Sequence, residues 1–344
     1  MSTTIADAVS LPRRAPFDTR PPAIADAAAA PGDLRSHLWA ALMFSALALA
    51  LYGILYAWSE ELVRETTQRN RFHRIATAAP THFDVAILGA SHALPLDFED
   101  MNRRLEERSR SKVVNLAIEG AGVVPWRVVH DHFSARHRAR HVVVFLDSFA
   151  FYGPKWNEER LDDVRLLRRA PFDIALLRAL WRVPEARRVA VDYASGFMKI
   201  NNPDRFASDI GDAEATRFAR VYRPVAQLDR QRIEYLYPKT VDPGLFQRYL
   251  AEFDILLATI RRDGAAIVAV KPPTPARYRS RLPAEAAFDV AIRAVLDRHG
   301  ARFEDMSTLL QEDRYYYDTD HLNRAGTVAF IDGPFGALLA SLPR

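Results

Sequence analysis

Four short apolar runs, each followed by a turn and a segment with helical spacing, restrict this 344-residue chain to an α/β fold. The runs extend from Asp84 to Leu88, Val113 to Ile118, His141 to Leu146 and Ala265 to Val270. Short runs that are apolar throughout are typical of parallel strands buried on both faces. The helical segments extend from Pro125 to Arg136, Pro243 to Arg262, Pro283 to His299 and Asn323 to Ser341. The alternation predicts right-handed crossovers and a three-layer α/β/α sandwich with a central parallel sheet.

The length suits one substantial core, and the sequence contains no repeat, so we expect one main domain, residues 81–344. Residues 149–238 interrupt it with a long, arginine-rich and aromatic segment that contains no comparable strand run. An insertion after a central strand lies near the carboxyl ends of the sheet, where open α/β folds bind ligands. We therefore expect either a lid over the site or a segment that packs against the stalk or a partner.

One apolar segment, residues 36–58, is long enough to cross a membrane as a helix, because a span needs roughly 20 residues. It carries no formally charged side chain if His37 is neutral. Tyr52, Tyr56 and Trp58 gather near its end, where aromatic rings suit the membrane interface. No small-residue cleavage site clearly follows, so the segment predicts an uncleaved anchor, with a buried core helix as the alternative.

Charges on either side of this segment predict its orientation. Four arginines precede it, Arg13, Arg14, Arg20 and Arg35, whereas Glu60 and Glu61 follow it. Because the basic side stays cytoplasmic, we expect a single-pass protein of the inner membrane, with its main domain in the periplasm or extracytoplasmic space. Residues 1–35 are rich in alanine and proline and predict a disordered cytoplasmic tail, and residues 59–80 predict a helical stalk.

Composition excludes several kinds of chemistry. The chain has 47 basic and 43 acidic side chains, so its net charge of +4 gives no reason to expect a nucleic-acid partner. It contains no cysteine, which excludes disulfides, thiolate zinc sites and cysteine nucleophiles. Histidines 130, 132, 137 and 141 lie close in sequence, but their spacing is a poor zinc pattern, and we expect no metal.

Two motifs predict catalytic side chains. Ser91 lies in a Gly-Ala-Ser-His turn after the first predicted strand, where a nucleophile is presented at the carboxyl edge of a sheet. Far downstream, Asp318 and His321 form a D-x-x-H pattern in a turn before the last helical segment. His321 would accept the serine proton and Asp318 would orient the imidazole. Asp320 is the competing orienter, but adjacent side chains diverge in most turns, so we prefer Asp318.

Each of these residues also has a structural interpretation. Ser91 suits the cap of the following helix, Asp318 and Asp320 suit a turn, and His321 suits a buried structural position. Catalysis is favoured by the joint occurrence of the serine and D-x-x-H motifs, each in the expected strand or turn context.

Over roughly residues 84–339 the chain resembles the SGNH, or GDSL-like, hydrolase superfamily, in particular its membrane-anchored branch associated with acylation of cell-surface polysaccharides. The resemblance implies a triad of Ser91, Asp318 and His321. It also implies an oxyanion hole built from the amides of Ser91 and Gly120, the latter in the sequence NLAIEGAG. Asn115 is a further feature similar to the family.

The chain departs from the family at the third motif, which should supply an asparagine after the third strand. Asp147 stands at the end of that strand instead. An ionised carboxylate cannot donate a hydrogen bond to an oxyanion, and losing one donor typically costs about 10²- to 10³-fold in rate. Two amides remain, and we expect Asp147 to hold a loop or a basic side chain.

The motifs and the resemblance together imply a serine esterase or O-acyltransferase that needs no cofactor. The resemblance implies acetyl groups of an exopolysaccharide or cell-wall polymer as the acyl groups, and a multi-pass membrane O-acyltransferase as a partner. The alternative is a non-catalytic scaffold or polysaccharide-binding component of a membrane acylation complex, which the missing asparagine favours.

Overall fold

The computed structural model describes residues 31–67, 69–78, 82–207 and 212–343. Contacts divide the chain into two compact units, Met1–Tyr52 and Gly53–Arg344. The first described element, helix α1 (Pro31–Thr66), contributes residues to both units. Most of the predicted tail lies outside the described residues, and residues 31–35 belong to α1.

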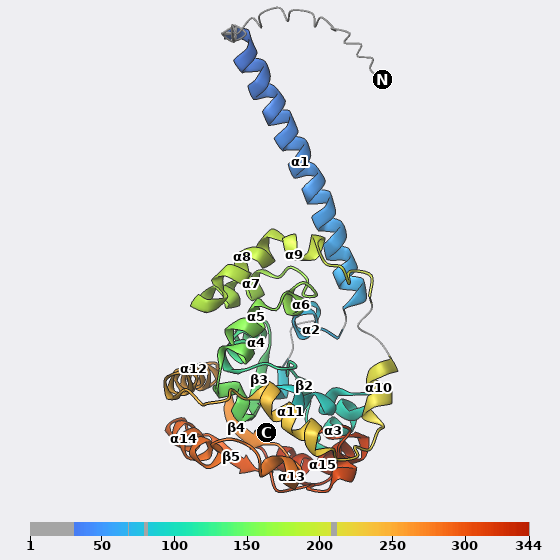
Figure 1. Ribbon diagram of the computed structural model, residues 1–344, viewed down its shortest axis with the longest axis vertical. Coiled ribbons are helices and arrows are strands. Elements are labelled where there is room, and N and C mark those ends of the chain that lie inside the picture. Colours follow the sequence, from blue (N-terminus) through green and yellow to red (C-terminus); the bar gives the residue numbers. More distant parts are fainter. Residues whose placement is uncertain (1–30, 68, 79–81, 208–211, 344) are drawn as a thin grey trace, which may run out of the picture. The chain divides into compact units, whose positions relative to one another are not determined.

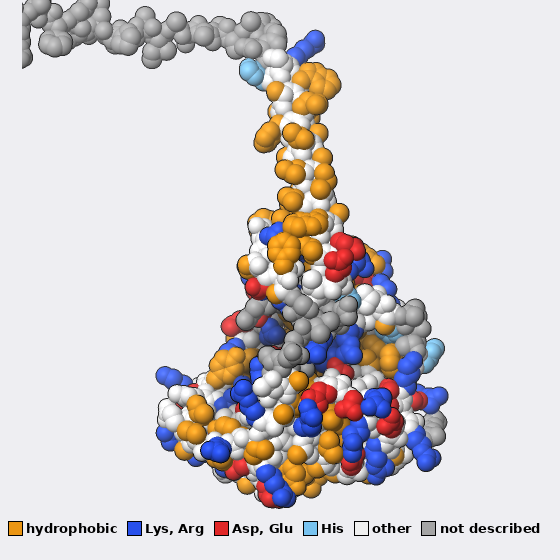
Figure 2. All heavy atoms as spheres, turned by 90° about the vertical axis from the view of Figure 1, so that its right-hand side faces the viewer, with side chains coloured by type: hydrophobic (Ala, Val, Ile, Leu, Met, Phe, Trp, Pro, Cys, Tyr) orange, Lys and Arg blue, Asp and Glu red, His pale blue; other side chains and the backbone are white. Residues whose placement is uncertain are grey.

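Helix α1 is long and apolar enough to span a membrane, as judged by length and composition over Leu34–Thr66. No residue of its most apolar window is buried. The visible face of its first part is almost entirely hydrophobic (Figure 2). The predicted segment 36–58 is thus the middle of a longer helix, which continues through good helix formers to Thr66.

The predicted stalk at residues 59–80 is not one helix. It comprises the end of α1 and a separate helix α2 (Arg71–Thr77). Asn70 starts α2, because its Oδ1 accepts hydrogen bonds from the amides of Phe72 and His73 at 2.9 and 3.2 Å. Just before this break, the Thr67 hydroxyl donates to the Arg169 carbonyl at 3.0 Å, which ties the stalk to the insertion.

Five parallel strands form the sheet in the order β2-β1-β3-β4-β5 (Figure 1). They are β1 (His82–Leu88), β2 (Val113–Asn115), β3 (Arg138–Phe145), β4 (Ala266–Lys271) and β5 (Arg302–Asp305). The chain moves outward from β1 first to one side and then to the other, so the order reverses beside β1. In open α/β sheets the carboxyl edge at such a reversal is the usual place for a ligand site.

Helices cover both faces of the sheet, which confirms the predicted three-layer arrangement. Ala86 and Leu88 of β1 pack into one core, whereas Val85 and Ile87 pack into the other. Helices α4 (Val123–Ser134), α12 (Pro243–Arg262) and α14 (Glu285–Arg298) cover the first face. Helices α3 (Met101–Ser109), α15 (Arg324–Asp332) and α16 (Pro334–Ala340) cover the second.

Three elements differ from the sequence predictions. Strand β2 ends at Asn115 rather than residue 118, and β5 was not predicted because its sequence, Arg-Phe-Glu-Asp, has no apolar run. The segment 323–341 forms two helices because Pro334 has no N–H and begins a new helix after Gly333.

Between β3 and α12 the described residues contain helices joined by turns and loops, and no strand. The elements are η2 (Ser148–Phe151), η3 (Pro154–Trp156), α5 (Glu158–Asp162), α6 (Val164–Leu167), α7 (Ile174–Arg182), η4 (Pro184–Ala186), α8 (Arg187–Ser195), α9 (Phe197–Ile200), α10 (Asp212–Phe218) and α11 (Ala226–Leu236). Lys199 forms an ion pair with Glu60, so one part of the insertion packs against the stalk. Arg232 in α11 instead contacts Asp320 and His321. One part of the insertion therefore contacts the stalk, and another contacts Asp320 and His321.

Candidate active site

Ser91 is the first residue of a short 3-10 helix, η1 (Ser91–Asp97), which follows β1 at the carboxyl edge of the sheet. Gly89 allows the chain after β1 to pass close to β3, since a Cβ atom at this position would lie 2.8 Å from the Cβ atom of Phe145 in β3. The Ser91 hydroxyl does not cap the helix, whose N-cap is Ala90 without a side-chain bond. Its Oγ lies 2.8 Å from Nε2 of His321.

The D-x-x-H turn brings Asp318 behind His321. Nδ1 of His321 lies 2.9 Å from Oδ2 and 3.0 Å from Oδ1 of Asp318. Asp318 Oδ1 also accepts hydrogen bonds from the amides of Asp320 and His321, at 3.1 and 2.9 Å, so Asp318 shapes the turn as well. These partners assign the proton of a neutral imidazole to Nδ1 and leave Nε2 to accept from Ser91.

Electrostatics keep Asp318 ionised. Burial alone would raise the pKa of its carboxyl, but the charge of His321 and the hydrogen bonds from it lower the pKa below its ordinary value. An ionised Asp318 favours the protonated imidazole that forms when His321 takes the serine proton. The ring of Tyr317 stacks on His321, with centroids 5.6 Å apart and planes inclined by 10°.

Asp320 is a second carboxylate next to the imidazole, but it is farther away. Its Oδ1 lies 3.5 Å from Nδ1 of His321, and the side chain is completely buried. Oδ1 accepts a 2.6 Å hydrogen bond from the Thr319 hydroxyl, and both oxygens lie 3.2 Å from Nε of Arg232. The pKa of Asp320 lies well below its ordinary value, because His321, Arg232 and His92 outweigh the effect of burial.

Asp147, at the position of the missing asparagine, holds a basic side chain. Its Oδ1 lies 2.6 Å from Nδ1 of His92, and both side chains are buried. His92 Nε2 lies 3.4 Å from Oδ2 of Asp320. Burial would lower the pKa of His92, but Asp147 and then Asp320 raise it to about 10. Asp147 is thus the counter-ion of an imidazolium and is not placed to donate a hydrogen bond.

Asn115 is the last residue of β2, and Gly120 lies in the loop that follows. Gly120 has a φ of +63°, and a Cβ atom there would lie 2.9 Å from the Trp156 ring, so both conformation and space require glycine. Asn115 donates to the Ala93 carbonyl at 2.7 Å and accepts from the Ala117 amide at 3.0 Å. Asn115 therefore joins η1 to the loop that carries Gly120 and has a supporting position.

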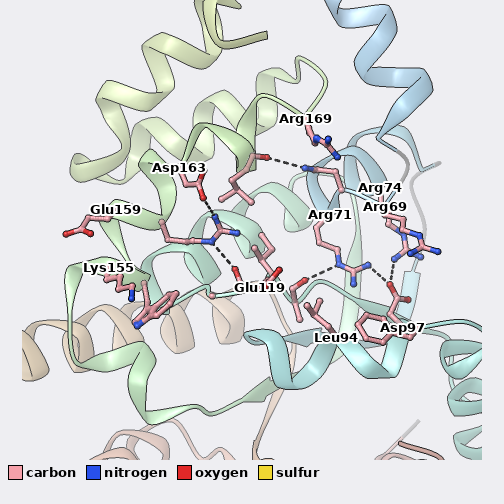
Figure 3. Close-up of a pocket in the computed structure, with 18 of the residues that line it drawn as sticks. Arg69, Arg71, Arg74, Leu94, Asp97, Glu119, Lys155, Glu159, Asp163 and Arg169 are labelled. Atoms are coloured by element: carbon pink, nitrogen blue, oxygen red, sulfur yellow. Dashed lines mark hydrogen bonds and ion pairs between the residues drawn. The ribbon is translucent and has the colours of Figure 1, made fainter. Parts of the chain in front are cut away.

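A cleft of about 990 Å³ borders this loop and η1 (Figure 3). Gly120 and Leu94 line it, together with Trp156 and Tyr235 of the insertion. Charged side chains of both signs also line it: Arg69, Arg71, Arg74, Lys155, Arg160, Arg169, Asp97, Glu99, Glu119, Glu159 and Asp163. Several are paired with one another, as Arg71 is with Asp97 and Arg160 with Asp163. Ser91, Asp318 and His321 do not line this cleft, which adjoins them through Gly120 and Leu94.

Two functional candidates were not predicted from the sequence. His92 adjoins Ser91, but nothing in its surroundings in sequence points to Asp147. Arg232 belongs to the insertion and has no motif around it. Its position is fixed through α11, because Arg277 bonds both to Asp229 of that helix at 2.6 Å and to the Thr319 carbonyl at 3.0 Å.

Among the described residues, His92, Asp320 and His321 have potential ligand atoms within 4.8 Å of one another, close enough for a metal ion. Hydrogen bonding accounts for the arrangement, since His92 Nδ1 faces Asp147 and His321 lies between Ser91 and Asp318. Three of the four histidines considered for zinc have separate partners. His130 contacts Asp263, His132 contacts Asp173 and His137 contacts the Ile75 carbonyl.

No protein-family model matches the chain, and no curated protein matches it. Solved structures do match, among them the crystal structure of a "putative acylhydrolase" from Bacteroides fragilis NCTC 9343. That match covers 79% of this chain and 95% of the other, with 8% identical residues and a TM-score of 0.39. A likeness at this level carries no argument about family or activity.

Proposed function

We propose that the protein is a serine esterase or O-acyltransferase of the SGNH type. The observation that carries this proposal is the hydrogen-bonded series Ser91, His321 and Asp318, with distances of 2.8 and 2.9 Å between side chains 230 and 3 positions apart in the sequence. A serine hydroxyl is a poor nucleophile without a base, and this arrangement supplies both a base and a group that orients it.

In the proposed reaction, Ser91 Oγ attacks the acyl carbon while His321 Nε2 takes the hydroxyl proton. The carbonyl π electrons move to the oxygen, which becomes the oxyanion of a tetrahedral intermediate. The intermediate expels the alcohol, which receives the proton from His321, and the acyl group remains on Ser91. Water or a sugar hydroxyl then gives its proton to His321 and attacks the acyl carbon. The second tetrahedral intermediate expels Ser91 Oγ, which regains the proton from His321, and the acid or acylated sugar leaves. The amides of Ser91 and Gly120 are the proposed donors to the oxyanion.

The setting supports a polymer substrate at a membrane. Helix α1 is long enough for an anchor, and the charges around it favour a main domain outside the cytoplasm. The cleft beside Gly120 gives room for a glycan chain. We therefore place the protein in the inner membrane with its site in the periplasm, acting on acetyl groups of an exopolysaccharide or cell-wall polymer. A multi-pass membrane O-acyltransferase is the proposed partner.

A specific observation favours the second candidate, a non-catalytic polysaccharide-binding or scaffold component. The carboxylate of Asp147 is held by His92, so the third oxyanion donor of the family is absent at that position. A protein that keeps the fold and has lost efficient chemistry would tolerate this change.

The two candidates are separated by incubating the full-length protein in detergent with 4-nitrophenyl acetate and a mixture of neutral and acidic oligosaccharides. We expect release of 4-nitrophenol above the background of Ser91→Ala, together with acetate or an O-acetylated sugar detected by mass spectrometry. Free acetate identifies an esterase, and an acetylated sugar identifies a transferase. If turnover equals that of Ser91→Ala and one oligosaccharide of the mixture stays bound to the protein, the result supports the scaffold instead.

A further inference from the structure

We infer that Arg232 is a further catalytic residue, whose guanidinium donates a hydrogen bond to an oxygen on the reacting carbon of the ester. This inference rests on the proposed esterase or acyltransferase function. It assigns to the insertion the stabilisation that the missing asparagine would have supplied.

The position of the guanidinium carries the inference. Nη2 of Arg232 lies 3.5 Å from Nε2 of His321, and Ser91 Oγ lies 2.8 Å from the same nitrogen. The serine nucleophile and the guanidinium therefore flank one atom. An acyl carbon bonded to Ser91 Oγ carries its remaining oxygens one bond further out, within reach of a planar cation with several N–H groups.

The guanidinium of Arg232 is held in place by the carboxylate of Asp320. Its Nε contacts both oxygens of the buried Asp320 at 3.2 Å, and its Nη2 lies beside Nε2 of His321. Helix α11 is itself tied down by the bond from Arg277 to Asp229. The pKa of Arg232 is raised, since the charge of Asp320 outweighs the effect of burial, so the group stays cationic. A preorganised cation in a buried site needs little rearrangement during reaction.

The carboxylates nearby cannot take this role. Asp147 and Asp320 present carboxylate oxygens, which accept hydrogen bonds from the residues around them. Nδ1 of His92 lies 2.6 Å from Asp147, whereas its Nε2 lies 3.4 Å from Oδ2 of Asp320 and has no hydrogen-bond partner among the described residues. Nη2 of Arg232, by contrast, contacts the proposed base itself, 3.5 Å from Nε2 of His321. Arg232 keeps its own proton throughout. It lowers the energy of the oxyanion that forms when the Ser91 proton moves to His321.

The test compares Arg232→Met and Arg232→Lys with the matched control Arg230→Met, which lies in the same helix and is exposed. The full-length proteins are assayed in detergent with three acetate esters whose alcohol parts are neutral, anionic or cationic. We expect Arg232→Met to lower kcat for all three by about 10²-fold, the typical effect of losing one such donor. KM should change little, Arg232→Lys should recover part of kcat, and Arg230→Met should match the wild type.

A double variant distinguishes direct action from positioning. If Arg232 acted only by holding Asp320, Arg232→Met would cause no further loss in an Asp320→Asn background. We expect a further loss of at least about 10-fold in that background, because the guanidinium contacts the substrate itself. Melting temperatures identify variants that fail to fold, and Arg232→Lys keeps the test valid if Arg232→Met does so.

Three results would overturn the inference: unchanged kcat, a loss confined to the anionic ester, or no further loss in the Asp320→Asn background. The second would assign Arg232 to recognition of an acidic alcohol part. A different result would show that the proposed function is wrong. In that case Ser91→Ala matches the wild type, and the inference falls with it. If Ser91→Ala is inactive while Arg232→Met is not impaired, only the inference is wrong.

Discussion

Replacing Ser91 by alanine is expected to lower acetyl-ester turnover by roughly 10⁴- to 10⁶-fold, the range found when a triad nucleophile is removed. The hydroxyl is the only atom changed that lies next to His321, at 2.8 Å, and an alanine offers no atom for the acyl group. Steady-state release of chromophore from the full-length protein measures the effect.

The matched control for this prediction is Ser280→Ala, an exposed serine whose hydroxyl donates to the Arg277 carbonyl at 3.2 Å. It should leave turnover unchanged. The melting temperature of Ser91→Ala should stay close to that of the wild type, since one hydrogen bond contributes about 1 kcal/mol. Retention of more than about a tenth of the turnover by a folded Ser91→Ala would contradict the proposed nucleophile.

Replacing Asp147 by alanine is expected to have the largest effect on stability, about 3–5 kcal/mol, because it leaves the buried His92 cation without its partner. For a domain of this size such a loss lowers the melting temperature by roughly 6 °C or more. The double variant His92→Ala/Asp147→Ala should be less destabilised than Asp147→Ala, because it leaves no unpaired charge.

The effect of Asp147→Ala should depend on pH. The pKa of His92 is raised from 6.5 to about 10 in the folded protein. A raised pKa contributes stability that is fully present below 6.5 and is lost as the pH rises towards 10. The difference in melting temperature between wild type and Asp147→Ala should therefore be larger at about pH 6 than at about pH 9. Equal differences at both pH values would show that His92 is not a paired imidazolium.

The parts of the fold that sequence reasoning found have strong local patterns. The four predicted strands are mostly buried, with the carboxyl-terminal residues of β1, β3 and β4 completely so, and their apolar runs cover these buried residues. Pro243 marks the first residue of α12. Strand β5 is at the edge of the sheet and partly exposed, which relaxes the need for apolar residues and removes the signal. The break at Pro334 shows that helical spacing alone does not reveal where one helix ends and the next begins.

In the candidate site, too, the residues with a local sequence pattern were predicted and the contacts between distant residues were not. Asp318 and His321 are three residues apart, so a turn alone brings them together, and Ser91 was recognisable by its place after a strand. The contacts of Asp147 with His92 and of Asp320 with Arg232 join residues 55 and 88 positions apart. No spacing pattern predicts such pairs, because the first depends on the pairing of β1 with β3 and the second on the position of α11. Comparison with the family pattern showed that Asp147 stands where an asparagine is expected, but it did not show that His92 contacts Asp147.

The most direct test of the proposed catalytic serine is covalent labelling of the full-length protein with a fluorophosphonate, followed by peptide mapping. Phosphonylation requires a hydroxyl activated by a neighbouring base, so it reports the Ser91–His321 pair without knowledge of the natural substrate. We predict one label per chain, located on Ser91 and absent from both Ser91→Ala and His321→Ala. A folded wild-type protein that takes up no label, or takes it up on another residue, would contradict the proposed mechanism.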